Sequence, residues 1–421
     1  MEKITANYRI VTPMFIGDAE QNASGISPSS IKGSLRFWWR ALNWNRYLNQ
    51  AQGDENQALH LLHQHEATLF GSTAEKDNPN SGQGAFILRV TPQNLKILSA
   101  ADLDNHPDYN LKTSQWHSYF LGLGLMEYQA KKGNFYQRSA IVSGTFTLQL
   151  FCRTAEHSEE LKQLLLLWGL FGGLGSRSRK GFGSISISEL TVSGKSEALP
   201  KNQQELIEIL ENLFKANQQT SESPYSAFSK NSRLIMSEKS SKPAWQQLGS
   251  VAKAMQLYRG WGYKTDVHRI NNEKANHEAY QHKVADHELV YQLAQDREPP
   301  RKIPDNLLFG LPRSYSLSSQ GRQEIKLESF ARLGDGDPDK NKRSRRAAPL
   351  FIHVHQFEND ESLVMQLFLP ARFLPEQDVI KLKRKNGEFN IPVPEDTDWQ
   401  VINEYLSIYP KPQWQELKHG D

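Results

Sequence analysis

The stretch TPMFIGDAEQNASGISPSSIKGSLRFWWRAL (residues 12–42) contains the end of a strand, a polar loop and the start of a helix. It follows an apolar run, Tyr8 to Val11, which is typical of a β-strand. Pro13 and Gly17 end this strand, because proline cannot donate to a sheet and glycine favours turns. The chain is therefore predicted to begin with a strand, a loop and a helix.

The predicted helix spans residues 29–48, with Ser29 or Ser30 as a suitable N-cap. One face is expected to be buried, because apolar side chains recur on it at helical spacing: Leu35, Trp39 and Leu42. Trp38 lies beside this face, and its ring could instead stack on a nucleic-acid base.

A basic stripe runs along the same helix. Lys32, Arg36 and Arg40 recur every four residues. On its own, such a stripe is typical of a solvated helix face. The helix start also offers free N–H groups and the positive end of the dipole to an anion, and Gly33 would let a backbone approach closely.

A second basic segment is GLFGGLGSRSRKGFG (169–183), the richest in glycine and basic residues in the chain. It follows a predicted strand over 140–152 and a leucine-rich helix over 159–170, and a strand over 184–190 comes next. Because it follows a helix, it does not fit a dinucleotide-binding loop, which follows a strand. Its cations, Arg177, Arg179 and Lys180, could reach phosphates from a thin loop.

The third basic segment is KNKRSRR (340–346), with Arg343, Arg345 and Arg346. The net charge is only +3, from 50 Lys and Arg against 47 Asp and Glu. Three basic segments in a nearly neutral chain mean that charge is segregated, which suits binding to a nucleic-acid backbone.

The 421-residue length suggests two or three domains. We expect one domain over 1–195, a junction over 196–232 and another over 233–421, with a polar insertion near 260–302. The runs 349–357 and 363–369 are predicted to pair as a hairpin, and a last helix is expected at about 398–408. No internal repeat of 20–50 residues is evident, although two diverged α+β halves remain possible.

Composition and motifs exclude several classes of site. A single cysteine, Cys152, rules out an intrachain disulfide and a multi-cysteine metal site. No P-loop motif occurs. Two groups of histidines are expected to be surface residues, so no metal or cofactor is predicted: His60, His63 and His65, and His268, His277, His282 and His287.

Three further features of the sequence indicate neither a metal site nor a membrane segment. His353 and His355 are expected to share one face of a strand. Residues 335–339 resemble the start of a calcium loop but lack its later ligands. Without a signal peptide or an apolar run of spanning length, we expect a soluble cytoplasmic protein with no membrane partner.

The motifs resemble those of the RAMP superfamily of CRISPR proteins. The run SIKGSLRFWWRAL (30–42) and the loop FGGLGSRSRKGFGS (171–184) are similar to the superfamily's signatures. The similarity is greatest to the first-subunit family of type III-B (Cmr) effector complexes. Weaker likenesses at 308–312 and 345–352 extend it toward the C-terminus.

This resemblance implies an α+β fold of two ferredoxin-like (RRM-like) domains with helical and loop insertions. It implies a non-catalytic subunit that binds the 3′ part of a CRISPR guide RNA, the paired target RNA and neighbouring RAMP subunits. Lys32, Gly33 and Arg36 match RNA-facing positions of the motif, and the loop positions are matched by Gly172, Gly173, Gly175, Arg177, Arg179, Lys180, Gly181 and Gly183. The complete predicted RNA-binding set is Ser30, Lys32, Gly33, Arg36, Trp38, Arg40, Gly173, Gly175, Arg177, Arg179, Lys180, Arg343, Arg345 and Arg346.

Two alternative functions remain open at this point. The first is a metal-independent RAMP endonuclease that processes CRISPR repeat RNA, with His157 as the nearest candidate acid–base to the glycine loop. The second is an adaptor that contacts only proteins through surface aromatic residues.

Overall fold

The structure is a computed structural model in which antiparallel sheets are covered by helices. It describes residues 2–73, 82–218, 222–259, 269–270, 273–274, 286–295, 303–317, 323–331, 345–385, 387–393 and 396–418. The predicted α+β class is confirmed by this mixture of packed helices and antiparallel sheets.

The first sheet is formed by strands from the N-terminal part of the chain. Neighbouring strands are antiparallel, and their order is β2 (Phe86–Leu98), β5 (Ala140–Cys152), β1 (Glu2–Ile10), β6 (Ile185–Val192) and β7 (Lys195–Ser196). The predicted strand over 140–152 is confirmed to the residue. β1 begins before Tyr8, where the strand was expected to start. Buried and more exposed residues already alternate from Ile4 onward, but the intervening polar residues make this alternation hard to recognise in the sequence.

Three long helices accompany this sheet: α1 (Pro28–Gln50), α2 (Glu55–Phe70) and α5 (Ser158–Phe171). The predicted helices over 29–48 and 159–170 are confirmed. The predicted N-cap of the first was wrong: Ser27 caps α1 by accepting from the backbone N–H of Ser30 at 3.2 Å, and Pro28 occupies the first turn. Proline suits that position because its missing N–H has no partner within a helix.

The second sheet has the same strand order as the first. It contains β15 (Leu350–Gln356), β16 (Ser362–Phe368), β8 (Arg233–Ser237) and β19 (Trp414–Lys418), with the predicted β15–β16 hairpin confirmed. In each sheet the principal strands lie in the order second, third, first, fourth along the chain. α7 (Ala244–Arg259) and α9 (Gln400–Ser407) follow the first and third strands of this sheet, as α1 and α5 do in the first.

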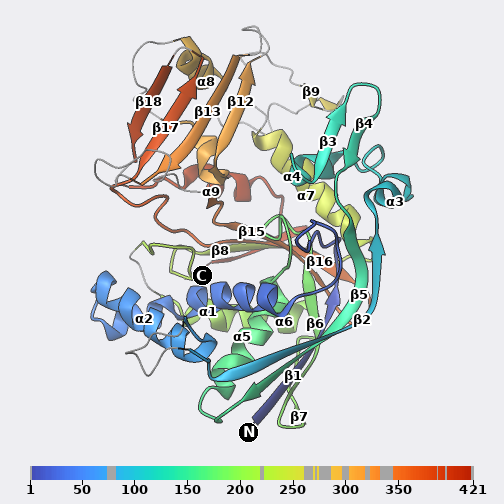
Figure 1. The fold of residues 1–421 in the computed structure, drawn as a ribbon, viewed down its shortest axis with the longest axis vertical. Helices are drawn as coiled ribbons and strands as arrows, with labels where there is room; N and C mark the ends of the chain where they lie inside the picture. Colours follow the sequence, from blue (N-terminus) through green and yellow to red (C-terminus); the bar gives the residue numbers. More distant parts are fainter. Residues whose placement is uncertain are drawn as a thin grey trace.

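A third sheet stands at the end of the molecule opposite the N-terminus (Figure 1). Its strands, in order, are β12 (Arg313–Leu317), β13 (Gln323–Phe330), β17 (Val379–Arg384) and β18 (Gly387–Pro392). The remaining short elements are α3 (Ala100–Asn105), α4 (Gln115–Leu121), β3 (Met126–Gln129), β4 (Gly133–Tyr136), β9 (Arg269–Ile270), β10 (Glu273–Lys274), α8 (Asp286–Gln295), η2 (Asp305–Phe309), β11 (Gly310–Leu311) and β14 (Arg346–Ala347).

A shared apolar core joins the first and second sheets. It contains Trp39 and Trp168 from α1 and α5, together with Phe351 and Met365 from the second sheet. The helix α6 (Gln203–Lys215), which lies within the expected junction over 196–232, buries its apolar face in the same core. Among the described residues, no helix is both long and apolar enough to cross a bilayer.

Candidate functional site

The N-terminal turns of α1 lie between two hollows. The larger, of about 750 Å³, is bounded by α1, the end of α2 and the start of β2, and Lys32, Gly33 and Arg36 line it. The smaller, of about 300 Å³, lies between α1, the glycine loop and β15, and its lining includes Ser30 and Arg179. The structure therefore places the glycine loop beside the first turns of the basic helix α1, with one hollow on each side of these turns.

Lys32 is the cation most available in the larger hollow. Its Nζ lies 5.9 Å from the centre of the Phe86 ring, and it forms no ion pair with any described residue. Burial, and secondarily the neighbouring Arg36 guanidinium, lower the pKa of Lys32. A bound anion would counter both effects, because it favours the charged form of the lysine.

Gly33 exposes helix backbone beside this lysine. A Cβ built on Gly33 would meet nothing within 4 Å, so the protein itself does not require glycine there. Glycine in a helix interior costs roughly 1 kcal/mol relative to alanine. The space beside the Gly33 backbone is therefore open to a ligand.

The other two cations of the stripe are already paired within the protein. Arg40 lies 3.2 Å from the buried Glu66 carboxylate, and Arg36 lies 3.7 Å from the same group. Arg36 also donates to the backbone carbonyl of Gly71. Glu66 thus neutralises part of the predicted basic stripe, which the sequence pattern did not reveal because Glu66 comes from α2.

The aromatic residues of the signature pack inside the molecule. Trp38 is only 3% exposed, with Phe171 stacked on its ring at 5.8 Å and Phe351 tilted at 5.3 Å. Trp39 is fully buried, as predicted. Trp38 therefore offers no free ring face on which a base could stack in this structure.

Arg179 connects the glycine loop to the second sheet. Its guanidinium lies over the adjacent rings of Phe37 and Phe351, 4.9 and 4.5 Å from their centres, and donates to the Ala348 carbonyl at 2.7 Å. Burial, and then Arg346, lower the pKa of Arg179 to about 10. These contacts occupy the guanidinium within the protein.

The glycines of the loop are required by the loop's own packing. Gly175 and Gly183 have φ of 86° and 62°. A Cβ at Gly175 would lie 2.6 Å from the Phe15 carbonyl oxygen, and one at Gly183 would lie 2.1 Å from the Leu174 carbonyl oxygen. Gly173 also lies close to Gly183, and it lines the smaller hollow with Gly175.

Arg177 and Lys180 contact the end of α4. Lys180 Nζ lies 3.3 Å from the Phe120 carbonyl oxygen, and Arg177 Nε donates to the Leu121 carbonyl at 2.8 Å. Burial lowers the pKa of Lys180 to about 7, with further lowering by Arg259, Arg177 and Arg313. No local pattern could predict this cluster of cations, because Arg259 and Arg313 come from α7 and β12.

Arg345 and Arg346 of the third basic segment line neither hollow but lie near the glycine loop, where burial and then Arg345 lower the pKa of Arg177, and burial and then Arg346 lower that of Arg179. Arg345 is exposed, whereas Arg346 is partly buried and donates to the Arg372 carbonyl at 2.9 Å. Arg343 lies outside the described residues, as do residues 335–339 and three histidines of the second group, His268, His277 and His282, whereas His287 lies in α8.

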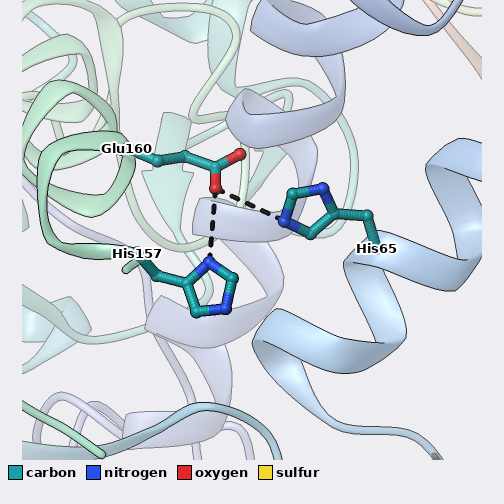
Figure 2. A group of neighbouring side chains, drawn as sticks. All are labelled: His65, His157 and Glu160. Carbon is teal, nitrogen blue, oxygen red and sulfur yellow. Dashed lines mark ion pairs between the residues drawn. The ribbon is translucent and has the colours of Figure 1, made fainter. Parts of the chain in front are cut away.

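His157 faces a cluster at the opposite end of α5 from the glycine loop. Since α5 has 14 residues, the two ends are about 20 Å apart. Figure 2 shows His157 and Glu160 pointing toward His65 of α2; the Glu160 Oε2 atom lies 3.4 Å from His65 Nε2 and 3.8 Å from His157 Nδ1.

The histidine predictions are partly confirmed. His60 and His63 are exposed, as expected, whereas His65 is only 22% exposed, so its surface assignment was wrong. The HxxE spacing of His157 and Glu160 was the signal that could have found the cluster of Figure 2, because residues three apart share a helix face. His353 and His355 share a strand face as predicted and are buried, which lowers the pKa of His355 to about 4.

Comparisons with known proteins find a family match over part of the chain and similar folds among solved structures. Residues 7–186, which include α1 and the glycine loop, match the family model of the RAMP superfamily. The fold is similar to apo Cmr1 from Pyrococcus furiosus, with a TM-score of 0.53, 16% identity and coverage of 98% of both chains. A chain in the cryo-EM structure of the type III-B Cmr-beta complex bound to cognate target RNA has a TM-score of 0.44 and 12% identity, over 97% of this chain and 98% of that one. No curated protein sequence matches the chain.

Proposed function

Taking residues 7–186 as a RAMP superfamily segment, we propose that this chain is a non-catalytic RNA-binding subunit of a type III-B CRISPR effector complex. It would hold the 3′ part of the guide RNA and its pairing with target RNA, beside other RAMP subunits. The similar fold of Cmr1 is consistent with such a role.

The proposed scaffold consists of two ferredoxin-like modules. Support comes from the strand order that the first and second sheets share, in which a helix follows the first and the third principal strand of each. We keep the division into 1–195, a junction over 196–232, and 233–421. The third sheet, together with the region near 260–302, is then an insertion into the second module.

The observation that carries the RNA-binding proposal is the pairing of Lys32 with the open backbone of Gly33 in the larger hollow. Lys32 supplies a charge that no described carboxylate neutralises, and Gly33 allows a phosphate to approach the helix start. Contact through the phosphodiester backbone leaves sequence selection to base pairing between guide and target. Ser30, Arg36 and the loop glycines line the two hollows, so the RNA would pass over the N-terminal turns of α1.

The test is RNA affinity as a function of salt. Lys32→Ala should weaken binding of the guide RNA and reduce the slope of log affinity against log salt by about 0.7, because one fewer counterion is released from a single strand. Lys195→Ala, which removes an exposed lysine on β7, serves as the matched control.

An unchanged salt slope in Lys32→Ala would contradict the proposed contact. No RNA binding by the wild-type protein, together with retained binding to neighbouring subunits, would favour the protein-only adaptor. The endonuclease alternative gains no support from the structure, because His157 lies a helix length from the loop that it would serve.

A further inference from the structure

The side chains of Figure 2 have the geometry of an incomplete coordination shell. One nitrogen from each of His65 and His157 and one oxygen of Glu160 lie within 4.8 Å of one another. The distances from Glu160 Oε2 to the two ring nitrogens, 3.4 and 3.8 Å, exceed the usual N–H···O range of about 2.7–3.2 Å. Two ligands of a tetrahedral zinc ion, each about 2.1 Å from it, lie about 3.4 Å apart.

Neighbouring side chains hold the ligand atoms in place. Trp39 Nε1 donates to Glu160 Oε1 at 2.7 Å, which leaves Oε2 to face the two histidines. The Tyr47 hydroxyl hydrogen-bonds to His65 Nδ1, while His65 Nε2 is a buried nitrogen without a hydrogen-bond partner. Ligating histidines usually have their second ring nitrogen fixed in this way.

We propose that His65, His157 and Glu160 bind one divalent transition-metal ion, with zinc best suited to the ligand set. Two imidazoles and a carboxylate are borderline ligands that zinc accepts, and three protein ligands leave a fourth position for water. The ion would connect α2 to the start of α5 over the buried face of α1. This inference departs from the absence of a metal site that the sequence predicted.

The local charges set limits on the affinity. The Arg46 guanidinium lies 3.9 Å from Glu160 Oε1 and opposes a second cation nearby. The side chains of His65, His157 and Glu160 are 22, 14 and 17% exposed, so an ion can enter from solvent. We therefore expect weaker binding than at a closed structural site with four protein ligands.

The experiment is a zinc titration of the full-length protein after removal of metal with a chelator. Competition with a chromophoric chelator should give one equivalent bound by the wild type. His157→Ala and Glu160→Gln should each weaken zinc binding at least tenfold. Loss of a residue that only orients a ligand already lowers metal affinity by roughly tenfold or more, and loss of a ligand should cost at least as much. His63→Ala, an exposed histidine on the same helix α2, should bind zinc as the wild type does.

A second readout covers the case in which His157→Ala does not fold. Zinc should raise the Tm of the wild type and of His63→Ala by more than that of Glu160→Gln at the same zinc concentration, since stabilisation of the folded state grows with affinity. Tyr47→Phe should fold and bind zinc about tenfold more weakly, because His65 loses its orienting partner. Equal affinity in the wild type and Glu160→Gln, no Tm rise in the wild type, or loss of binding in His63→Ala would each overturn the proposal.

Discussion

At the scale of single residues, the cations of the site differ by what they contact. Arg36 and Arg40 face Glu66, and Arg179 packs over two adjacent aromatic rings, whereas Lys32 faces a hollow. A cation that is already paired or buried gains less from a phosphate than one without an acidic partner. The structure therefore distinguishes cations that are free to bind a phosphate from cations that already have partners, whereas the sequence pattern treated them alike.

Gly33 gives the first prediction. Gly33→Ala should raise the free energy of unfolding by up to about 1 kcal/mol, because alanine is the better helix former and its methyl group meets no protein atom. The same methyl group should weaken guide RNA binding about tenfold by blocking close approach. Urea denaturation and RNA titration measure the two effects, and a stabilised variant with unchanged affinity would show that RNA does not approach this backbone.

Lys180 gives the second prediction, on pH dependence. Its folded-state pKa of about 7 lies below its ordinary value, so above pH 7 the unfolded chain binds a proton that the folded chain does not. The free energy of unfolding should therefore rise between pH 7 and pH 9, by about 1–2 kcal/mol from this group.

The measurement is urea denaturation at both pH values for the wild type and Lys180→Met. The methionine variant retains the apolar stem and should lose this part of the rise. An identical pH dependence in the two proteins would show that Lys180 titrates normally in the folded state.

At the scale of elements, the start of α1 is set by the residues of its first turn, and the path of the glycine loop is set by its backbone conformation. Ser27 and Pro28 start α1 two residues before the predicted cap, which places Ser30 inside the helix and next to the smaller hollow. The loop folds on itself at Gly175 and Gly183, where left-handed φ and close carbonyl oxygens exclude side chains. The shape of both elements beside the hollows is thus set by an uncharged cap and by backbone packing.

The cap gives the third prediction. Ser27→Ala should lower the free energy of unfolding by about 1 kcal/mol, since the Ser30 N–H loses its side-chain acceptor. Ser29→Ala, in the same turn, should change it by much less because Ser29 accepts no backbone N–H of the helix start. Denaturation curves that show equal effects for the two variants would place the cap elsewhere.

At the scale of the whole molecule, the glycine loop joins the two halves of the chain. The Ile352 N–H donates to the Arg179 carbonyl at 2.9 Å, and serines next to the loop accept from β15, with Ser184 Oγ 3.2 Å from the Val354 nitrogen. The loop thus lies between β6 and an edge of the second sheet. Its basic residues contribute to this junction as well as to the surface.

Arg179 gives the fourth prediction. Arg179→Ala should destabilise the protein by about 2–4 kcal/mol, because it removes the guanidinium that packs over Phe37 and Phe351 and leaves the Ala348 carbonyl unpaired. Its effect on the salt dependence of RNA binding should be small compared with that of Lys32→Ala. A large loss of salt slope with little change in stability would instead make Arg179 a direct phosphate contact.

The local pattern of the chain was sufficient to predict α1, β5, α5 and the β15–β16 hairpin, because hydrophobic periodicity depends only on neighbours in sequence. The spacing of basic residues, the glycine content and the resemblance to a family motif brought forward Lys32, Gly33 and the glycine loop as separate candidate segments. Only the tertiary structure decided which cations are free, since Glu66, Phe351 and Ala348 reach them from distant elements. It also decided that His65 meets His157 and Glu160, because contacts between separate helices depend on packing that no local period encodes.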